Sequence, residues 1–252
     1  MTVETKFEER VAVIRMELGK GNAIDDRFLA AMTGALDGVE TSDACALVVT
    51  GAGRAFSGGL DLAYTGALSR EELGRFVDAF DAFFTRVFAF PLPVVAAVNG
   101  HAVAGGAVLA LAADYRIMAR GVFRIGLNEV AVGIPFPSGA FEVSRHALPA
   151  PAFGEAFLEG RLFSPEEALE VGLVHRVVDG DALIPESVDK ARLLSAGSKA
   201  AIRIVKSDER APVLARIRVQ QEARKQRFLE AWFSADAQAR MRAIRLRIGK
   251  AT

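Results

Sequence analysis

The chain has 252 residues, of which 51% are apolar, and its 31 basic residues are balanced by 31 acidic ones. Zero net charge gives no overall attraction to nucleic acid or to an anionic membrane. The single cysteine, Cys45, excludes an intrachain disulfide and suits a reducing compartment. Apolar runs such as 94–98 are far shorter than the roughly 20 residues of a membrane span. We therefore expect a cytoplasmic protein with neither nucleic acid nor membrane as a partner.

Strands and helices alternate in the first half of the chain. Three apolar runs predict buried strands: 11–16, 46–50 and 94–98. Between the first two, Asp25 or Asp26 is a candidate cap for an amphipathic helix. Ser69, with Glu72 three residues later, predicts a capping box at the start of a second helix. This order predicts an α/β core with right-handed βαβ crossovers.

The later part of the chain becomes increasingly helical. Residues 105–113 predict a small-residue helix, and two short strands follow at 115–118 and 122–125. Ser164 and Pro165 mark another helix start, before a strand over 174–178. Residues from about 184 to 250 read as helix. We therefore expect a core over residues 1–190 and a helical region over 191–252.

Several kinds of site are disfavoured by spacing. His101, His146 and His175 lie far apart and have no metal-ligand spacing. Ser57 lies too far beyond its strand for a nucleophile elbow, which should follow the strand almost directly. The loop that begins Gly51-Ala52-Gly53 has Phe56 where a dinucleotide fingerprint needs its third glycine.

Two glycine-rich segments remain, 54–62 and 99–107, and each follows a predicted buried strand. Loops at the ends of neighbouring strands can face each other across a pocket. Unpaired N–H groups of two such loops can together form an oxyanion hole. The glycines alone leave open a purely structural role in tight turns and close packing.

These two segments, Phe56-Ser57-Gly58-Gly59-Leu60-Asp61-Leu62 and Asn99-Gly100 with Ala104-Gly105-Gly106, resemble the signature segments of the crotonase (enoyl-CoA hydratase/isomerase) family. The resemblance implies a ββα spiral core with a helical C-terminal region that builds trimers or dimers of trimers. It also implies a coenzyme-A (CoA) thioester whose carbonyl oxygen binds the N–H groups of Leu60 and Gly105. No separate cofactor is implied, because CoA enters with the substrate.

The resemblance also bears on the reaction. Glu129 matches the glutamate shared by hydratases and isomerases, while Val108 stands where hydratases carry a second glutamate. Hydration shares its work between two carboxylates, whereas moving a double bond from C3 to C2 needs one carboxylate that acts as base and then acid. The combination of Glu129 with Val108 and the two glycine-rich segments resemble mitochondrial-type Δ3,Δ2-enoyl-CoA isomerases more than hydratases. We therefore expect an isomerase, with Val108 forming an apolar wall opposite Glu129.

The remaining residues expected along the substrate are Arg54, Ala55, Ser57, Gly59, Asp61, Ala104 and Val108, with Arg54 near the CoA phosphates. An arginine-rich tail can also meet CoA, although interspersed acids favour a solvated or interface helix over RNA binding. Alternatives are a hydratase or another family reaction, with Glu142 and Asp61 as spare acids, and a non-catalytic acyl-CoA-binding protein.

Overall fold

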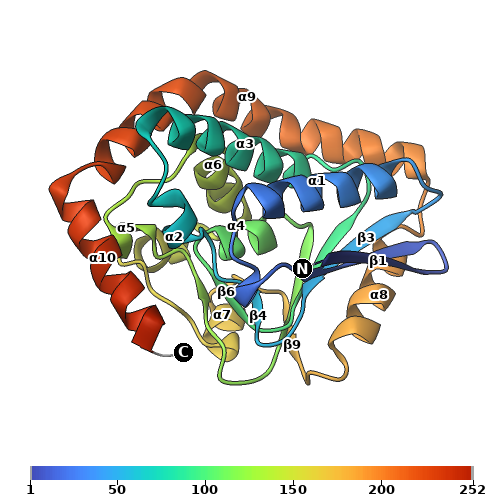
Figure 1. The fold of residues 1–252 in the computed structure, drawn as a ribbon. Helices are drawn as coiled ribbons and strands as arrows, with labels where there is room; N and C mark the ends of the chain where they lie inside the picture. Colours follow the sequence, from blue (N-terminus) through green and yellow to red (C-terminus); the bar gives the residue numbers. More distant parts are fainter. Residues whose placement is uncertain (1, 251–252) are drawn as a thin grey trace.

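The computed structural model describes residues 2–250, in which the larger of two sheets has six strands in the order β1-β2-β3-β5-β7-β9. Their bounds are Thr2–Glu8, Val11–Glu17, Ala46–Gly51, Val94–Val98, Tyr115–Ala119 and Arg176–Val178. Strand β1 pairs antiparallel with β2, and every later pair is parallel. Figure 1 shows the β1–β2 pair at one side of the molecule.

Both faces of the large sheet are covered, which explains why its central strands are continuous apolar runs. Alternate side chains such as Val48 and Val95 pack beneath helix α8 (Leu183–Leu194). Their neighbours Val49 and Ala96 face the main core. That core also holds the apolar faces of α1 (Asp26–Glu40) and α3 (Arg70–Phe88).

A second, smaller sheet has three parallel strands in the order β4-β6-β8. Their bounds are Ala55–Ser57, His101–Val103 and Ile125–Gly126. Each follows a strand of the large sheet along the chain, and each is followed by helix: α2 (Leu62–Thr65) and α3, α4 (Gly105–Leu111), and α5 (Glu129–Val132). The chain thus repeats a strand–strand–helix unit, and the ββα spiral expected from the sequence is confirmed.

Hydrogen bonds of Asn99 join the turns that link the two sheets. Its side-chain oxygen accepts from the Gly51 N–H at 2.8 Å, and its amide nitrogen donates to the Gly53 carbonyl at 3.1 Å. Gly100 has no room for a side chain, because a Cβ there would collide with the Arg54 carbonyl. The Asn99-Gly100 pair therefore fixes where β6 starts relative to β4.

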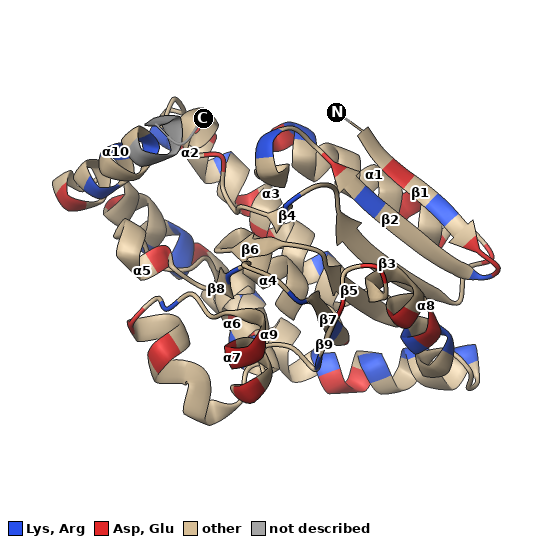
Figure 2. Cartoon of the chain, turned by 90° about the horizontal axis from the view of Figure 1, so that it is seen from below, with Lys and Arg blue, Asp and Glu red and all other residues tan. Residues whose placement is uncertain are grey.

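Helices cover the rest of the molecule. After α6 (Ser138–Ala147) come short 3-10 and π segments (Ala150–Ala152, Gly154–Leu158), α7 (Pro165–Glu170), α8, α9 (Lys199–Trp232) and α10 (Ala235–Lys250). Helix α9 packs along α3 and α6, and α10 turns back onto α5 and α2 of the same chain (Figure 1). Seen from below, basic and acidic residues are interspersed (Figure 2). No described helix is long and apolar enough to cross a membrane.

The structure also differs from the sequence-based elements in places. Strand β1 was not predicted, because its side chains are mostly exposed and lack an apolar pattern. The strand expected over 122–125 lies at Ile125–Gly126. The expected helical stretch is three helices, with breaks at 195–198 and 233–234. The predicted caps Asp25, Ser69 and Ser164 are confirmed by their side-chain hydrogen bonds.

An ion-pair network fastens α9 to the core. The Asp114 carboxylate, just before β7, binds both the Lys206 ammonium and the Arg210 guanidinium, the latter at 2.6 Å. It also accepts from the Val94 N–H at 2.7 Å. Lys206 donates in addition to the Leu92 carbonyl at 2.8 Å. All three charged side chains are less than one-fifth exposed, so each depends on the others for compensation.

We predict that Asp114→Ala lowers the free energy of unfolding by about 3 kcal/mol, because it leaves the largely buried Lys206 without its anion and Arg210 with only Glu209. Urea denaturation measures the change. The control is Asp208→Ala, an exposed aspartate on α9 with no ion pair among the described residues. Equal midpoints for the two variants would show that the network contributes little.

Candidate active site

The small sheet brings three segments to one edge. Leu60 lies three residues beyond β4, Gly105 two beyond β6, and Glu129 three beyond β8. Because β4, β6 and β8 are adjacent and parallel, their carboxyl ends meet at the same edge. Leu60, Gly105 and Glu129 accordingly line one cavity of about 540 Å³.

The Leu60 N–H is left free by the pairing of its own segment. Ile24 and Leu60 form a parallel bridge, in which the Ile24 N–H donates to the Gly59 carbonyl at 2.8 Å and the Asp61 N–H donates to the Ile24 carbonyl at 3.0 Å. Alternation along an extended chain then turns the N–H of Leu60 away from Ile24. It has no acceptor within residues 2–250.

The Gly105 N–H is free for a different reason. Gly105 is the first residue of α4, where backbone donors have no partner inside the helix. Ala104 before it has φ +50°, a strained value for a residue with a side chain. A Cβ at Gly59 would lie 3.1 Å from the Gly105 nitrogen, so the two glycine loops touch. The two free amides therefore belong to loops in direct contact.

Glu129 is the first residue of α5, just beyond the third strand, β8, and the residue is 8% exposed. Its Oε2 has no hydrogen-bond partner among the described residues. Burial penalises the charged form and raises the pKa of Glu129 to about 8, an effect that a hydrogen bond from the residue's own backbone N–H offsets only in part. Because the most effective general bases have a pKa near the working pH, this carboxylate is suited to accepting and returning a proton.

The other residues expected along the substrate fall into two groups. Asp61 and Ala104 line the cavity with the three central residues. Arg54, Ala55, Ser57, Gly59 and Val108 are not among its lining residues. Ser57 is structural, donating to the Asn22 carbonyl at 2.8 Å, and Val108 is fully buried within the core. The apolar wall beside Gly105 comes instead from Phe80, whose ring lies 3.2 Å from the position of a Gly105 Cβ.

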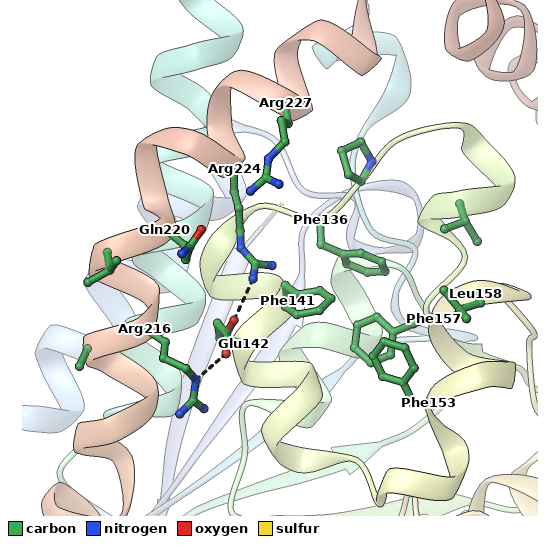
Figure 3. A pocket seen from close by; sticks show the side chains of 14 residues that line it. Phe136, Phe141, Glu142, Phe153, Phe157, Leu158, Arg216, Gln220, Arg224 and Arg227 are labelled. Carbon is green, nitrogen blue, oxygen red and sulfur yellow. Dashed lines mark hydrogen bonds and ion pairs between the residues drawn. The ribbon is translucent and has the colours of Figure 1, made fainter.

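Neither spare acid is free for chemistry. One carboxylate oxygen of Asp61 accepts from the N–H groups of Ala63 and Tyr64, both at 2.9 Å, and thereby caps α2. Glu142 lies in a different cavity and binds Arg216 and Arg224, each at 2.9 Å (Figure 3). Glu129 is thus the one carboxylate lining the 540 Å³ cavity, within the described chain, that makes no side-chain hydrogen bond.

Sequence reasoning missed several lining residues. Lys20 is a basic one, and Phe80, Phe228 and Ile244 are apolar ones, whereas the second basic residue at this cavity, Arg245, belongs to the arginine-rich tail named above as able to meet CoA. Phe228 comes from α9, while Ile244 and Arg245 come from α10. No local pattern marks these residues, because their helices reach the cavity only through tertiary packing. Segment 134–141 contributes Ile134, Pro137 and Ala140 to the lining, and segment 64–72 contributes none of the lining residues.

Two unpaired amides beside a buried carboxylate form an arrangement that can stabilise a developing oxyanion and move a proton. Residues 6–244 match the family model described as enoyl-CoA hydratase/isomerase, and the chain belongs to this family of enzymes, also called crotonases.

Curated relatives include both hydratases and isomerases. The crotonyl-CoA hydratase of Syntrophomonas wolfei is 34% identical over 206 residues, covering 79% of this chain and 78% of that protein. The mitochondrial enoyl-CoA delta isomerase 1 of rat is 32% identical over 182 residues, covering 71% and 63%. The crystal structure of human mitochondrial delta3-delta2-enoyl-CoA isomerase superposes with a TM-score of 0.95 at 26% identity, covering 100% of both chains. The comparisons therefore place the chain in the enoyl-CoA hydratase/isomerase family, with similar proteins of both activities.

We predict that Glu129→Gln stabilises the protein at alkaline but not at acidic pH. The pKa of Glu129 is raised by folding, so ionising it costs stability as the pH rises from about 4.5 to about 8. Glutamine removes that cost, and the variant should gain on the order of 3 kcal/mol at pH 8 and almost nothing at pH 4. Urea denaturation at both pH values, with exposed Glu159→Gln as control, tests this. A gain that is equal at both pH values would contradict it.

Proposed function

We propose that the protein is an enoyl-CoA isomerase that moves a double bond of an acyl-CoA thioester from C3 to C2. The observation that supports this most directly is the single uncommitted carboxylate, Glu129, beside two free backbone amides. The proposed chemistry needs one base, one oxyanion site and no cofactor other than the CoA of the substrate.

In the proposed mechanism, the thioester oxygen accepts hydrogen bonds from the N–H groups of Leu60 and Gly105. Glu129 takes a proton from C2, and the electron pair of that C–H bond moves toward the oxygen to form a dienolate. The protonated Glu129 then gives the proton to C4, so that the C3–C4 double bond becomes a C2–C3 double bond. The two amides stabilise the negative charge, and removing one such donor typically costs a hundredfold or more in rate.

Hydration is the runner-up, because relatives of both kinds match the chain. Adding water to C3 needs a base for the water and an acid for C2, work that two carboxylates usually share. The position of the second carboxylate in hydratases is Val108, which is fully buried, and Asp61 and Glu142 are committed elsewhere. These placements favour isomerisation over water addition.

Incubation of the purified protein with 3-enoyl-CoA and, separately, with 2-enoyl-CoA tests the proposal. We expect isomerisation to exceed hydration, with kcat/KM rising as the pH approaches 8 and Glu129 loses its proton. Glu129→Gln should lower kcat by at least about a hundredfold, whereas Glu159→Gln should not. Water addition as fast as isomerisation would replace the proposal with hydration. Tight acyl-CoA binding without turnover of any substrate would indicate the non-catalytic binder.

We also propose that the protein assembles as a homotrimer or as a dimer of trimers through the cavity of Figure 3. That cavity, about 720 Å³, has an aromatic floor that includes Phe141 and Phe157 and a rim of arginines from α9. Exposed apolar side chains flank it: Val219 is 78% and Leu158 is 69% exposed. A second copy of the chain would cover this apolar surface.

Sedimentation equilibrium tests the assembly. We expect the wild-type protein to sediment as three chains or six, and Leu158→Asp with Val219→Asp to sediment as a monomer with unchanged circular dichroism. Both substitutions are at exposed positions, so they should leave the monomer fold intact. A monomeric wild type, or an oligomer that survives both substitutions, would exclude this interface.

A further inference from the structure

The active-site cavity has two different ends. Lys20, Gly58 and Ala63 line it and are exposed, which places its mouth beside β4 and α2. Phe80, Ala140 and Phe228 line it too and are at most 5% exposed. The buried end is therefore apolar, and the open end carries a lysine.

The two amides lie between these ends. Leu60 follows exposed Gly58 by two residues, and Gly105 is in contact with the ring of Phe80. A thioester oxygen bound there separates a charged, hydrated CoA from an apolar acyl chain. The CoA arm favours the open end, and the acyl chain favours the buried end, where its apolar surface leaves water.

We propose that Phe228 closes the buried end of this cavity and restricts the enzyme to short and medium acyl chains. This inference rests on the proposed function, because it assigns the acyl direction from the oxyanion site. The cavity of 540 Å³ holds roughly 18 groups of the size of a water molecule, at about 30 Å³ each. If the thioester and part of the CoA arm fill about half of that volume, acyl chains of up to roughly ten carbons fit.

Phe228 is better placed than Phe80 to set this limit. Phe80 packs against Phe84 with ring centroids 4.6 Å apart and also supports Gly105, so changing it disturbs the oxyanion site. Phe228 is held by stacking on Trp232, with centroids 5.6 Å apart, on a helix outside the ββα core. Shortening Phe228 therefore extends the cavity toward α9 and leaves both amides in place.

Rates with 3-enoyl-CoA substrates of 6 to 16 carbons test the proposal, chosen to bracket a limit of roughly ten. We expect wild-type kcat/KM to fall steeply beyond the limit. Phe228→Leu should raise kcat/KM for the first excluded length by about tenfold relative to kcat/KM for the shortest substrate, because one methylene in an apolar pocket discriminates on that scale. Ala140→Val, at the same end of the cavity, should reduce the length of the longest acyl chain that the enzyme accepts. The control is Phe83→Leu, which is 3% exposed on α3 and does not line the cavity.

Calorimetric binding of saturated acyl-CoA esters of the same lengths separates failure of this inference from failure of the proposed function. A protein without isomerase activity whose binding still stops at a length set by residues 140 and 228 would overturn the reaction and keep the acyl limit. An active isomerase whose length profile is the same in wild type, Phe228→Leu and Ala140→Val would overturn the limit. A loss of kcat/KM in the two variants that is equal at every chain length would also overturn the limit.

Discussion

The arrangement on which the active site depends is the pairing of three short parallel strands, β4, β6 and β8. Together they span only eight residues, yet they place the two glycine loops and Glu129 at one edge. Strands this short cannot hold register alone, so they rely on the large sheet and on the Asn99 hydrogen bonds that join the connecting turns. The contacts that stabilise the scaffold therefore also determine the geometry of the site.

The site itself is locally unfavourable. A buried carboxylate with one unpaired oxygen, two unpaired backbone N–H groups and a strained Ala104 all raise the free energy of the folded chain. The surrounding core compensates, since both faces of the large sheet are closed by apolar clusters. In the proposed reaction, the unpaired N–H groups gain an acceptor when a thioester oxygen binds them, and the cost of burying the Glu129 charge disappears when a proton reaches it. Unpaired amides and desolvation therefore favour the charge distribution that the proposed reaction passes through.

Local sequence patterns predicted the strands and helix caps that depend on residues close together in the sequence. Buried strands appear as apolar runs, and the caps at Asp25, Ser69 and Ser164 need only a side chain and a nearby N–H. The central residues Leu60, Gly105 and Glu129 were reached through motif resemblance, and the structure brings all three to one cavity. Strand β1 and the lining residues Phe228 and Ile244 were not predicted. The exposed side chains of β1 show no apolar pattern, and Phe228 and Ile244 reach the cavity only because α9 and α10 fold back over the core.

The residues proposed to carry out the chemistry and those proposed to select the substrate lie in different parts of the chain. The groups proposed to act on the thioester all lie within the first 129 residues, on loops locked by the two sheets. The walls contributed by Phe228, Ile244 and Arg245 come from helices that pack onto the finished core. If the acyl chain occupies the buried end as proposed, a change at these positions of α9 or α10 alters the volume offered to it without moving the Leu60 or Gly105 amide. A family built on this plan can therefore vary its acyl substrate while the oxyanion site stays fixed, because different parts of the chain position the two.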